Sequence, residues 1–100
     1  MRIVLTRDAD LDLAGITTFT LGHFGQVQAD RYLDGLDAFI SELPKRRYRL
    51  RPVKSKHPGF WRAAYKSHVV FVRVGGDLMT VVRVLHDKMD PENYLPTVPL

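Results

Sequence analysis

Residues 60–86 read FWRAAYKSHVVFVRVGGDLMTVVRVLH, and this stretch decides the fold. Lys66-Ser67 and Gly75-Gly76-Asp77 have the length and composition of tight hairpin turns. The three runs that they separate are rich in Val, Phe, Tyr and Thr, as strands are, and span residues 60–66, 68–74 and 78–86. The stretch therefore predicts a three-stranded antiparallel meander.

Upstream of the meander, apolar residues repeat at helical spacing in two segments. A short apolar run at residues 3–6 predicts a strand, and the acidic residues after it are typical of the first turn of a helix. The two helical faces comprise Ala9, Leu13, Ile16 and Thr20, and then Ala29, Leu33, Leu36, Ile40 and Leu43. A break at residues 22–25 separates the helices, and Pro44 ends the second. We therefore expect an α+β fold: an N-terminal strand, an antiparallel helical hairpin and the meander.

The composition is that of one ordinary folded domain covering residues 1–100. With 45% hydrophobic and 26% charged residues, the chain has enough apolar residues for one core and too few charges for a disordered protein. It contains no cysteine, which excludes a disulfide framework, a thiolate metal site and a cysteine nucleophile. No apolar stretch has the length of a signal peptide or a membrane span, so we expect a cytoplasmic location.

Charge is distributed unevenly along the chain. Residues 1–43 carry three arginines against seven acidic residues, whereas residues 44–100 carry twelve basic residues against four acidic ones. Nine of the basic residues fall within one acid-free segment: Lys45, Arg46, Arg47, Arg49, Arg51, Lys54, Lys56, Arg62 and Lys66. Such a segment indicates a polyanionic or acidic partner, the alternative being a solvated surface that only aids solubility.

A two-residue turn at Lys66-Ser67 would place Tyr65 opposite His68 and sort the strands into two faces. The face that the helical hairpin would cover carries Trp61, Ala63, Tyr65, Val70, Val72, Val74, Met79, Val81 and Leu85, with Arg83 as its one charge. The second face carries Phe60, Arg62, Ala64, Lys66, Val69, Phe71, Arg73, Leu78, Thr80, Val82, Val84 and His86. No predicted element remains to cover the second face, which indicates a binding surface. A register slip of one residue, or a basic segment folded back over this face, would remove that surface.

Few residue patterns point to catalysis. The four histidines lack metal-ligand spacing, and there is no phosphate-binding loop or nucleophile elbow, so we expect no metal and no cofactor. His86, at the end of the last strand, could act as a general acid or base, although a structural role is more common for a lone histidine. The carboxylate pairs Asp10/Asp12 and Asp34/Asp37 are expected to face solvent on the helices.

Taken in order, these segments resemble the RelE/ParE toxins of bacterial toxin-antitoxin pairs. Residues 9–16, ADLDLAGI, are similar to the start of those toxins after their first strand, and residues 24–36 are similar to their second helix. The strongest similarity lies in SHVVF at 67–71 and VVRVLH at 81–86, which read like the ParE branch. The fold of that family is a strand, a helical hairpin and an antiparallel meander, which agrees with the elements expected above.

The resemblance also implies a function. ParE members poison DNA gyrase and are neutralised by acidic antitoxins. We therefore expect a growth-arresting toxin that acts by binding gyrase, assembles with a ParD-like antitoxin and meets DNA only through gyrase. RelE members instead cleave messenger RNA on the ribosome, which is the alternative activity, and an inactive antitoxin-binding module is a third.

The resemblance assigns roles to the basic and apolar residues of the meander and its loop. The expected antitoxin-binding surface, which would take a helix in a groove or an added strand, comprises Phe60, Arg62, Val69, Phe71, Arg73 and Val82. The expected target-binding set comprises Arg46, Arg47, Arg49, Arg51, Lys54 and Lys56. In the nuclease alternative, Arg62 and Arg73 would hold phosphate and His86 would move a proton.

Overall fold

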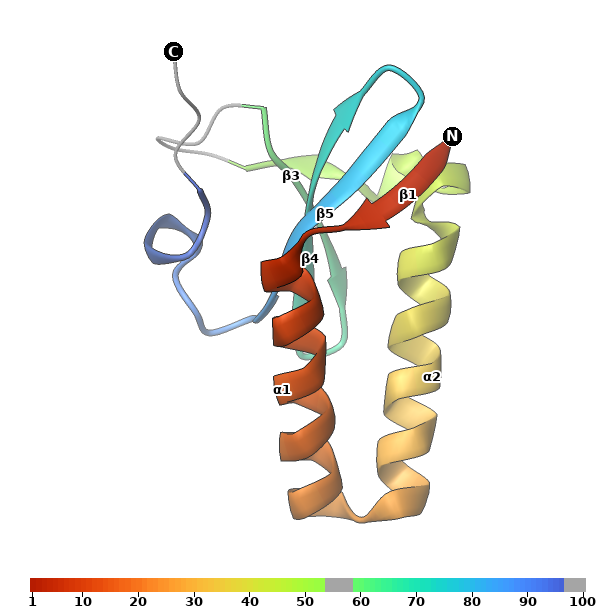
Figure 1. Ribbon diagram of the computed structural model, residues 1–100, viewed down its shortest axis with the longest axis vertical. Coiled ribbons are helices and arrows are strands. Elements are labelled where there is room, and N and C mark those ends of the chain that lie inside the picture. Colours follow the sequence, from red (N-terminus) through yellow and green to blue (C-terminus); the bar gives the residue numbers. More distant parts are fainter. Residues whose placement is uncertain (54–58, 97–100) are drawn as a thin grey trace.

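A computed structural model describes residues 1–53 and 59–96, and it confirms the α+β fold (Figure 1). The helices and strands are β1 (Arg2–Leu5), α1 (Arg7–Phe24), α2 (Gln26–Glu42), β2 (Arg51–Pro52), β3 (Trp61–Tyr65), β4 (His68–Gly75) and β5 (Leu78–His86). Three short 3₁₀ turns are η1 (Leu43–Lys45), η2 (Arg47–Arg49) and η3 (Pro91–Asn93). The sheet order is β1-β5-β4-β3-β2, with β1 parallel to β5 and the other pairs antiparallel.

The meander matches its prediction at both turns. Tyr65 lies opposite His68, so Lys66 and Ser67 form a two-residue turn, and Lys66 has a φ of 49°. In the second turn Gly76 has a φ of 56°, a left-handed conformation that glycine adopts without steric cost. Two further strands flank this meander. The predicted N-terminal strand, β1, pairs with β5, and the short β2, which was not predicted, pairs with β3.

The two helices form the expected hairpin on one face of the sheet (Figure 1). Thr6 caps α1, since its side-chain oxygen accepts from the Ala9 N–H at 3.1 Å. The expected break at residues 22–25 is shorter in the structure, where α1 continues to Phe24 and Gly25 alone reverses the chain with a φ of 82°. A glycine such as Gly22 weakens a helix by only about 1 kcal/mol and does not end it.

The main core lies between the hairpin and the sheet. Its buried residues come from every layer: Ala9, Leu36, Ile40, Leu43, Leu50, Ala63, Val70, Val72, Met79, Val81 and Val84. Tyr65 packs at its margin, and its hydroxyl lies so close to Gly35 of α2 that a methyl group there would sit 2.0 Å from it. The prediction that Trp61 belongs to this core is wrong. Trp61 is the first residue of β3, and 38% of its surface is exposed.

A β-bulge corrects the assignment of residues to the two faces. Val72 lies opposite Val81 but Phe71 lies opposite Arg83, so β5 holds one extra residue, Val82. Beyond the bulge the alternation is shifted. Val84 therefore belongs to the main core and Leu85 to the second face, the reverse of the prediction. Likewise Arg83 lies on the second face and His86 on the helical face, where the opposite was predicted.

The second face of the sheet is covered, so the prediction that no element would cover it is wrong. The C-terminal segment with η3 crosses this face, on the side opposite the helices (Figure 1), and buries Leu95 to 6% exposure. A second core forms beneath it: Phe60, Val69, Phe71, Val82, Leu85 and Leu95, with Val53 and Met89 at the margin. Val53 follows the basic turns, so the interpretation in which that segment folds back over the face is partly correct.

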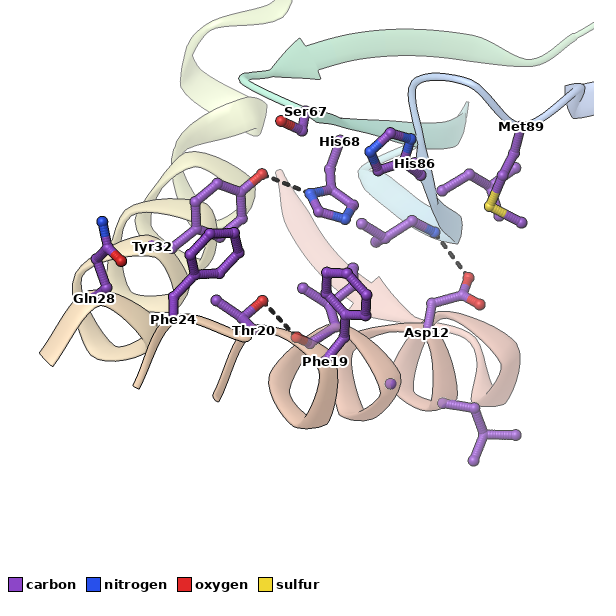
Figure 2. Close-up of a pocket in the computed structure, with 15 residues that line it drawn as sticks. Asp12, Phe19, Thr20, Phe24, Gln28, Tyr32, Ser67, His68, His86 and Met89 are labelled. Atoms are coloured by element: carbon purple, nitrogen blue, oxygen red, sulfur yellow. Dashed lines mark hydrogen bonds between the residues drawn. The ribbon is translucent and has the colours of Figure 1, made fainter. Parts of the chain in front are cut away.

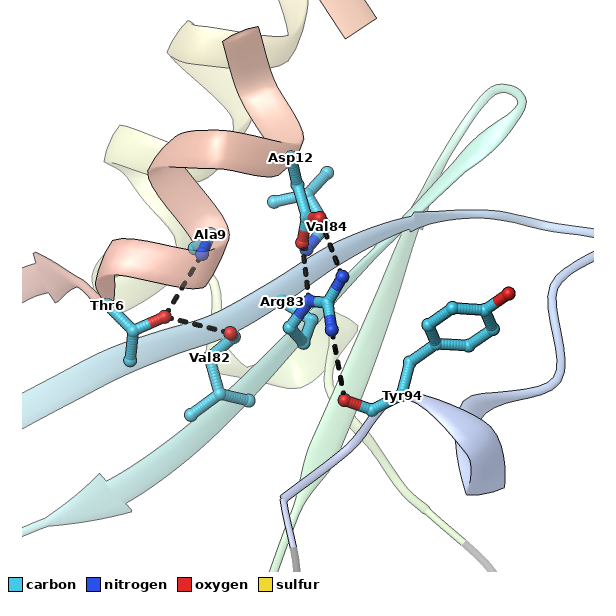
Figure 3. Close-up of polar contacts among 7 residues, drawn as sticks. All are labelled: Thr6, Ala9, Asp12, Val82, Arg83, Val84 and Tyr94. Atoms are coloured by element: carbon cyan, nitrogen blue, oxygen red, sulfur yellow. Dashed lines mark hydrogen bonds and ion pairs between the residues drawn. The ribbon is translucent and has the colours of Figure 1, made fainter. Parts of the chain in front are cut away.

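Arg83 of β5 connects α1 with the C-terminal segment (Figure 3), because it pairs with Asp12 and donates to the Tyr94 carbonyl at 3.1 Å. Asp12, expected to face solvent, instead accepts from Arg83 through both carboxylate oxygens, at 2.7 and 2.8 Å. It also accepts from the Val84 N–H at 2.9 Å, while the Thr6 hydroxyl donates to the Val82 carbonyl at 2.8 Å. These groups lie where β1 has ended, so the two side chains satisfy β5 backbone that has no neighbouring strand. The hydrogen bonds with Asp12 raise the pKa of Arg83, which stays charged.

Candidate functional site

A groove of about 640 Å³ lies between the helical hairpin and the end of the sheet (Figure 2). We call it the hairpin groove. Its helical wall includes Ile16, Phe19 and Phe24, and its other wall includes His68, Leu85 and His86 at the end of the sheet. Both helices extend past the sheet toward the Gly25 junction (Figure 1), so the sheet leaves this part of the hairpin uncovered.

Large apolar side chains remain exposed around the hairpin groove. Leu11, Phe19 and Phe24 line it and are each 58% exposed, and Val27 near the junction is 68% exposed. Isolated exposed apolar residues are common, but a contiguous group on a concave surface marks a place where another molecule binds. The groove is therefore the candidate binding surface, and it is built largely from α1.

A row of polar groups crosses the groove wall. A hydrogen bond of 2.5 Å joins the Tyr32 hydroxyl to Nδ1 of His68, and the rings of His68 and His86 meet edge to face at 5.5 Å. Nδ1 of His86 lies 3.0 Å from the Asp87 carboxylate. Burial lowers the pKa of His68, helped by the neighbouring His86, so this imidazole is neutral near pH 7. Burial also raises the pKa of Tyr32, whose hydroxyl keeps its proton.

The structure does not bring together the three residues of the nuclease alternative. His86 lies opposite His68 and faces the helices, because the bulge at Val82 shifts the end of β5. Arg62 and Arg73 share the other face, as predicted. The Arg62 guanidinium lies 5.8 Å from the ring centroid of Phe71, and the Arg73 guanidinium lies 5.5 Å from that of Phe60.

The surface expected to bind an antitoxin is mostly closed in the structure. Its four apolar residues are 1% to 6% exposed beneath the C-terminal segment: Phe60, Val69, Phe71 and Val82. Arg73 is exposed and Arg62 is partly exposed. Exposed apolar side chains gather instead at the hairpin groove, which Leu11, Phe19 and Phe24 line.

The basic segment lies at the other end of α2 from the groove. Arg46, Arg47, Arg49 and Arg51 are all exposed, whereas Lys54 and Lys56 fall outside the described residues. Arg46 pairs with Glu42 at 3.1 Å and donates to the Tyr48 hydroxyl at 3.2 Å. The hydrogen bonds from Arg46 and Arg49 lower the pKa of this tyrosine. Four of the six expected target-binding residues thus form one accessible basic surface.

Of the groove residues, His86 was a candidate from the sequence, whereas Leu11, Phe19, Phe24, Tyr32 and His68 were not, although the helical residues carry a signal. Leu11 and Phe19 lie off the apolar face formed by Ala9, Leu13, Ile16 and Thr20, and Phe24 continues that face one turn beyond Thr20, so none of the three joins the main core. Apolar residues outside the core face of a helix are the pattern expected for a second contact surface. Tyr32 and His68 come from elements 36 residues apart and gave no local pattern.

Residues 1–53 and 59–96 hold neither a candidate metal site nor a candidate membrane span. No group of three or more His, Cys, Asp or Glu side chains there is arranged to hold a metal ion. No helix in that part of the chain combines the length and apolar character of a membrane span.

Comparisons with known proteins fit this geometry. Residues 3–91 match the family model described as the ParE toxin of the type II toxin-antitoxin system, parDE. Toxin ParE1 of Caulobacter vibrioides is 35% identical over 91% of this chain and 94% of its own length. Toxin ParE of Escherichia coli is 31% identical over 87% of this chain and 85% of its own length.

Solved structures support the same fold. The chromosomal ParDE toxin-antitoxin system from P. aeruginosa aligns with a TM-score of 0.74 and 19% identity, covering 86% of this chain and 95% of that one. The RelBE2 toxin-antitoxin complex from Mycobacterium tuberculosis aligns with a TM-score of 0.60 and 19% identity, covering 84% and 94%. From the matched family model and the two curated relatives, the chain belongs to the ParE toxin family of type II toxin-antitoxin systems.

Proposed function

We propose that this toxin inhibits DNA gyrase in the cytoplasm by binding to it, and that a cognate acidic antitoxin neutralises it. The observation that carries the choice of a binding mechanism is the placement of His86 on one face of the sheet and of Arg62 and Arg73 on the other. The family resemblance supplies the target, and the exposed basic surface at Arg46, Arg47, Arg49 and Arg51 supplies a place to contact it.

Messenger RNA cleavage is the second candidate function. It requires a base for the 2′-hydroxyl, cations around the phosphate and an acid for the leaving oxygen, all within hydrogen-bond reach of one phosphodiester. The polar groups from Tyr32 through His68 to His86 could move protons, but they lie in a largely apolar groove. Arg62 and Arg73, which would hold the phosphate, lie on the opposite face of the sheet. A binding mechanism therefore has the better support.

The antitoxin is assigned to the hairpin groove. The structural relatives include complexes of toxins with antitoxins, and the groove offers this chain's accessible concave apolar surface to a partner. An amphipathic helix would place its apolar side chains against Leu11, Phe19 and Phe24 and leave its acidic side in solvent. The complex is expected to be a hetero-oligomer.

The test is supercoiling of relaxed plasmid by purified gyrase as the full-length toxin is added, with cleaved DNA scored in the same gel. Inhibition with accumulated double-strand breaks, reversed by stoichiometric antitoxin, is the expected result. Unchanged supercoiling at molar excess of folded toxin would overturn the proposal. A parallel ribosome-dependent RNA cleavage assay, with His86→Gln as the variant, separates the second candidate from the first.

A further inference from the structure

We propose that Arg51, Arg62 and Arg73 form a phosphodiester-binding site, so that the toxin contacts the DNA backbone directly. We call these three residues the arginine row. The inference deepens the proposed function and rests on it for the identity of the nucleic acid, since gyrase holds DNA. Its physical basis is independent of gyrase.

Strand register places the three arginines on one face of the sheet. Arg51 of β2 lies directly opposite Arg62 of β3. Arg62 lies directly opposite Phe71 of β4, and Arg73 follows Phe71 by two residues, so it points to the same side. Neighbouring strands are about 4.8 Å apart, so the row spans about 12 Å diagonally, the axial length of three to four base pairs at about 3.4 Å each.

Like charges directly opposite each other on adjacent strands are destabilising. Among the described residues, none of the three arginines has a carboxylate partner, whereas Arg83 in the same transverse row is held by both oxygens of Asp12. Asp12 thus neutralises Arg83, which has a structural role. The repulsion among Arg51, Arg62 and Arg73 is not relieved within the described chain, and a bound anion would relieve it.

The arginine row is also held in position before any ligand binds. The guanidinium groups of Arg62 and Arg73 lie over the rings of Phe71 and Phe60, which are 2% and 1% exposed and therefore form a rigid floor. Arg51 donates to the Tyr48 carbonyl at 2.7 Å and to that of Leu50 at 3.1 Å. A guanidinium has five N–H donors, so stacking on a ring leaves its edge able to bind a phosphate oxygen.

The surroundings favour nucleic acid over an acidic protein segment. Stable protein partners need apolar anchors that become buried at the contact, but Leu95 already closes the apolar strip beside the row. A phosphate backbone needs no such anchor, because charge neutralisation supplies most of its binding energy. Exposed Tyr48 lies beside the cations, since its backbone carbonyl accepts from Arg51, and exposed aromatic side chains of this kind can stack on bases.

The experiment measures binding of a fluorescently labelled 20-base-pair DNA duplex to the full-length toxin without gyrase, at increasing salt. Three phosphate contacts predict a slope of about −2.7 for the logarithm of the association constant against the logarithm of salt concentration. Arg62→Gln should make the slope shallower by about 0.9. The matched control, Arg46→Gln, removes the same charge from the same basic segment but leaves the row intact, so it should change the slope by less than half as much.

Other outcomes overturn the inference. Equal losses for Arg62→Gln and Arg46→Gln would mean diffuse attraction without a site, and undetectable binding would remove the site altogether. A poly-glutamate peptide that binds as tightly as DNA, with the same dependence on Arg62, would assign the row to an acidic protein. An RNA of the same length that binds more tightly than DNA would break the link to gyrase.

A second measurement separates this inference from the proposed function. The variant with Arg51, Arg62 and Arg73 all changed to Gln should melt no lower than the unsubstituted chain, because the substitutions relieve repulsion. If this variant loses DNA binding but inhibits gyrase undiminished, direct DNA contact plays no part in inhibition and the inference fails alone. If the unsubstituted toxin binds DNA and does not inhibit gyrase, the proposed function fails alone.

Discussion

The hairpin groove and the arginine row differ in the kind of recognition that they offer. The groove lies on the helical side of the sheet and presents apolar side chains, with histidines in its wall. The row lies on the opposite side and presents cations over a floor that the chain itself has closed. Burial of apolar surface depends weakly on salt, whereas contacts to phosphates depend on it steeply. One small toxin can thus hold two partners by forces that respond differently to the same conditions.

The largest expected effect concerns the contrast between Arg83, which has an acidic partner, and the arginine row, which has none within residues 1–53 and 59–96. Asp12→Ala leaves Arg83 and the Val84 N–H without their partner in a site where the ion-paired side chains are 14% and 18% exposed. We expect the free energy of unfolding to fall by about 3 kcal/mol, measured by urea denaturation.

The control for that change is Asp34→Ala on the exposed side of α2, expected to alter stability by less than about 0.5 kcal/mol. Removing a cation from the row should likewise cost nothing. If Asp12→Ala proves as mild as Asp34→Ala, the distinction between a structural and a binding arginine would be lost.

The next prediction concerns a substitution that would expose apolar surface on the second face of the sheet, as the hairpin groove already does. Leu95→Ala would remove the side chain that closes the apolar strip above Phe60 and Phe71, at a cost of about 2 kcal/mol in stability. Binding of a hydrophobic dye should rise, because this face would then expose apolar surface as the groove does. A variant that melts as before and binds no more dye would show that Leu95 does not close the face.

A third prediction sharpens the role of the groove. Phe19→Ser should weaken antitoxin binding about tenfold, or about 1.4 kcal/mol, with little change in stability, because this side chain lines the groove and is already 58% exposed. Calorimetry at two salt concentrations should give the same loss, since the contact is apolar. Leu21→Ser is the matched control, because Leu21 is exposed on the same helix and does not line the groove. Equal effects of the two variants would move the antitoxin elsewhere.

The smallest expected effect is a pH dependence that resides in the groove wall. Because the pKa of His68 is lower in the folded chain than in the unfolded chain, the unfolded chain binds more protons as the pH falls. The contribution of neutral His68 to stability is therefore complete above the unfolded value of about 6.5, and it is lost as the pH falls through the lower folded value. His68→Gln should flatten the denaturation free energy between pH 7.5 and about 5 relative to the unsubstituted chain. Parallel pH profiles for the two proteins would contradict this.

Most of the fold could be predicted from the sequence because its signals are local. Lys66-Ser67 and Gly75-Gly76-Asp77 have turn chemistry, and the apolar spacing of α2 continues up to Pro44. The acidic residues after the first strand likewise indicated the start of α1, although the capping role of Thr6, which was expected in the strand, was not predicted. Each of these features depends on residues that are close together in the chain.

The candidate site was harder to predict because its signals are not local. The bulge at Val82 has no distinct composition, since a valine there fits a regular strand equally well, yet it moves His86 to the other face. Closure of the second face depends on Leu95, which follows the last predicted strand in a segment where the sequence predicts no helix or strand. The groove exists because both helices extend past the end of the sheet, a relation between elements that no single segment encodes.

The hydrogen bonds made by Thr6 and Asp12 to β5 also limit how a partner can attach. Beyond the end of β1, the Val82 carbonyl and the Val84 N–H would otherwise be open to a strand from another molecule. At the opposite margin of the sheet, β2 is only two residues long and ends in Pro52, which has no N–H to donate. Both features shorten the backbone with which a strand from another molecule could pair, although the outer edge of the four-residue β1 has no neighbouring strand in the described part of the chain. They therefore limit edge-to-edge aggregation of the free toxin and favour recognition by an antitoxin through side chains.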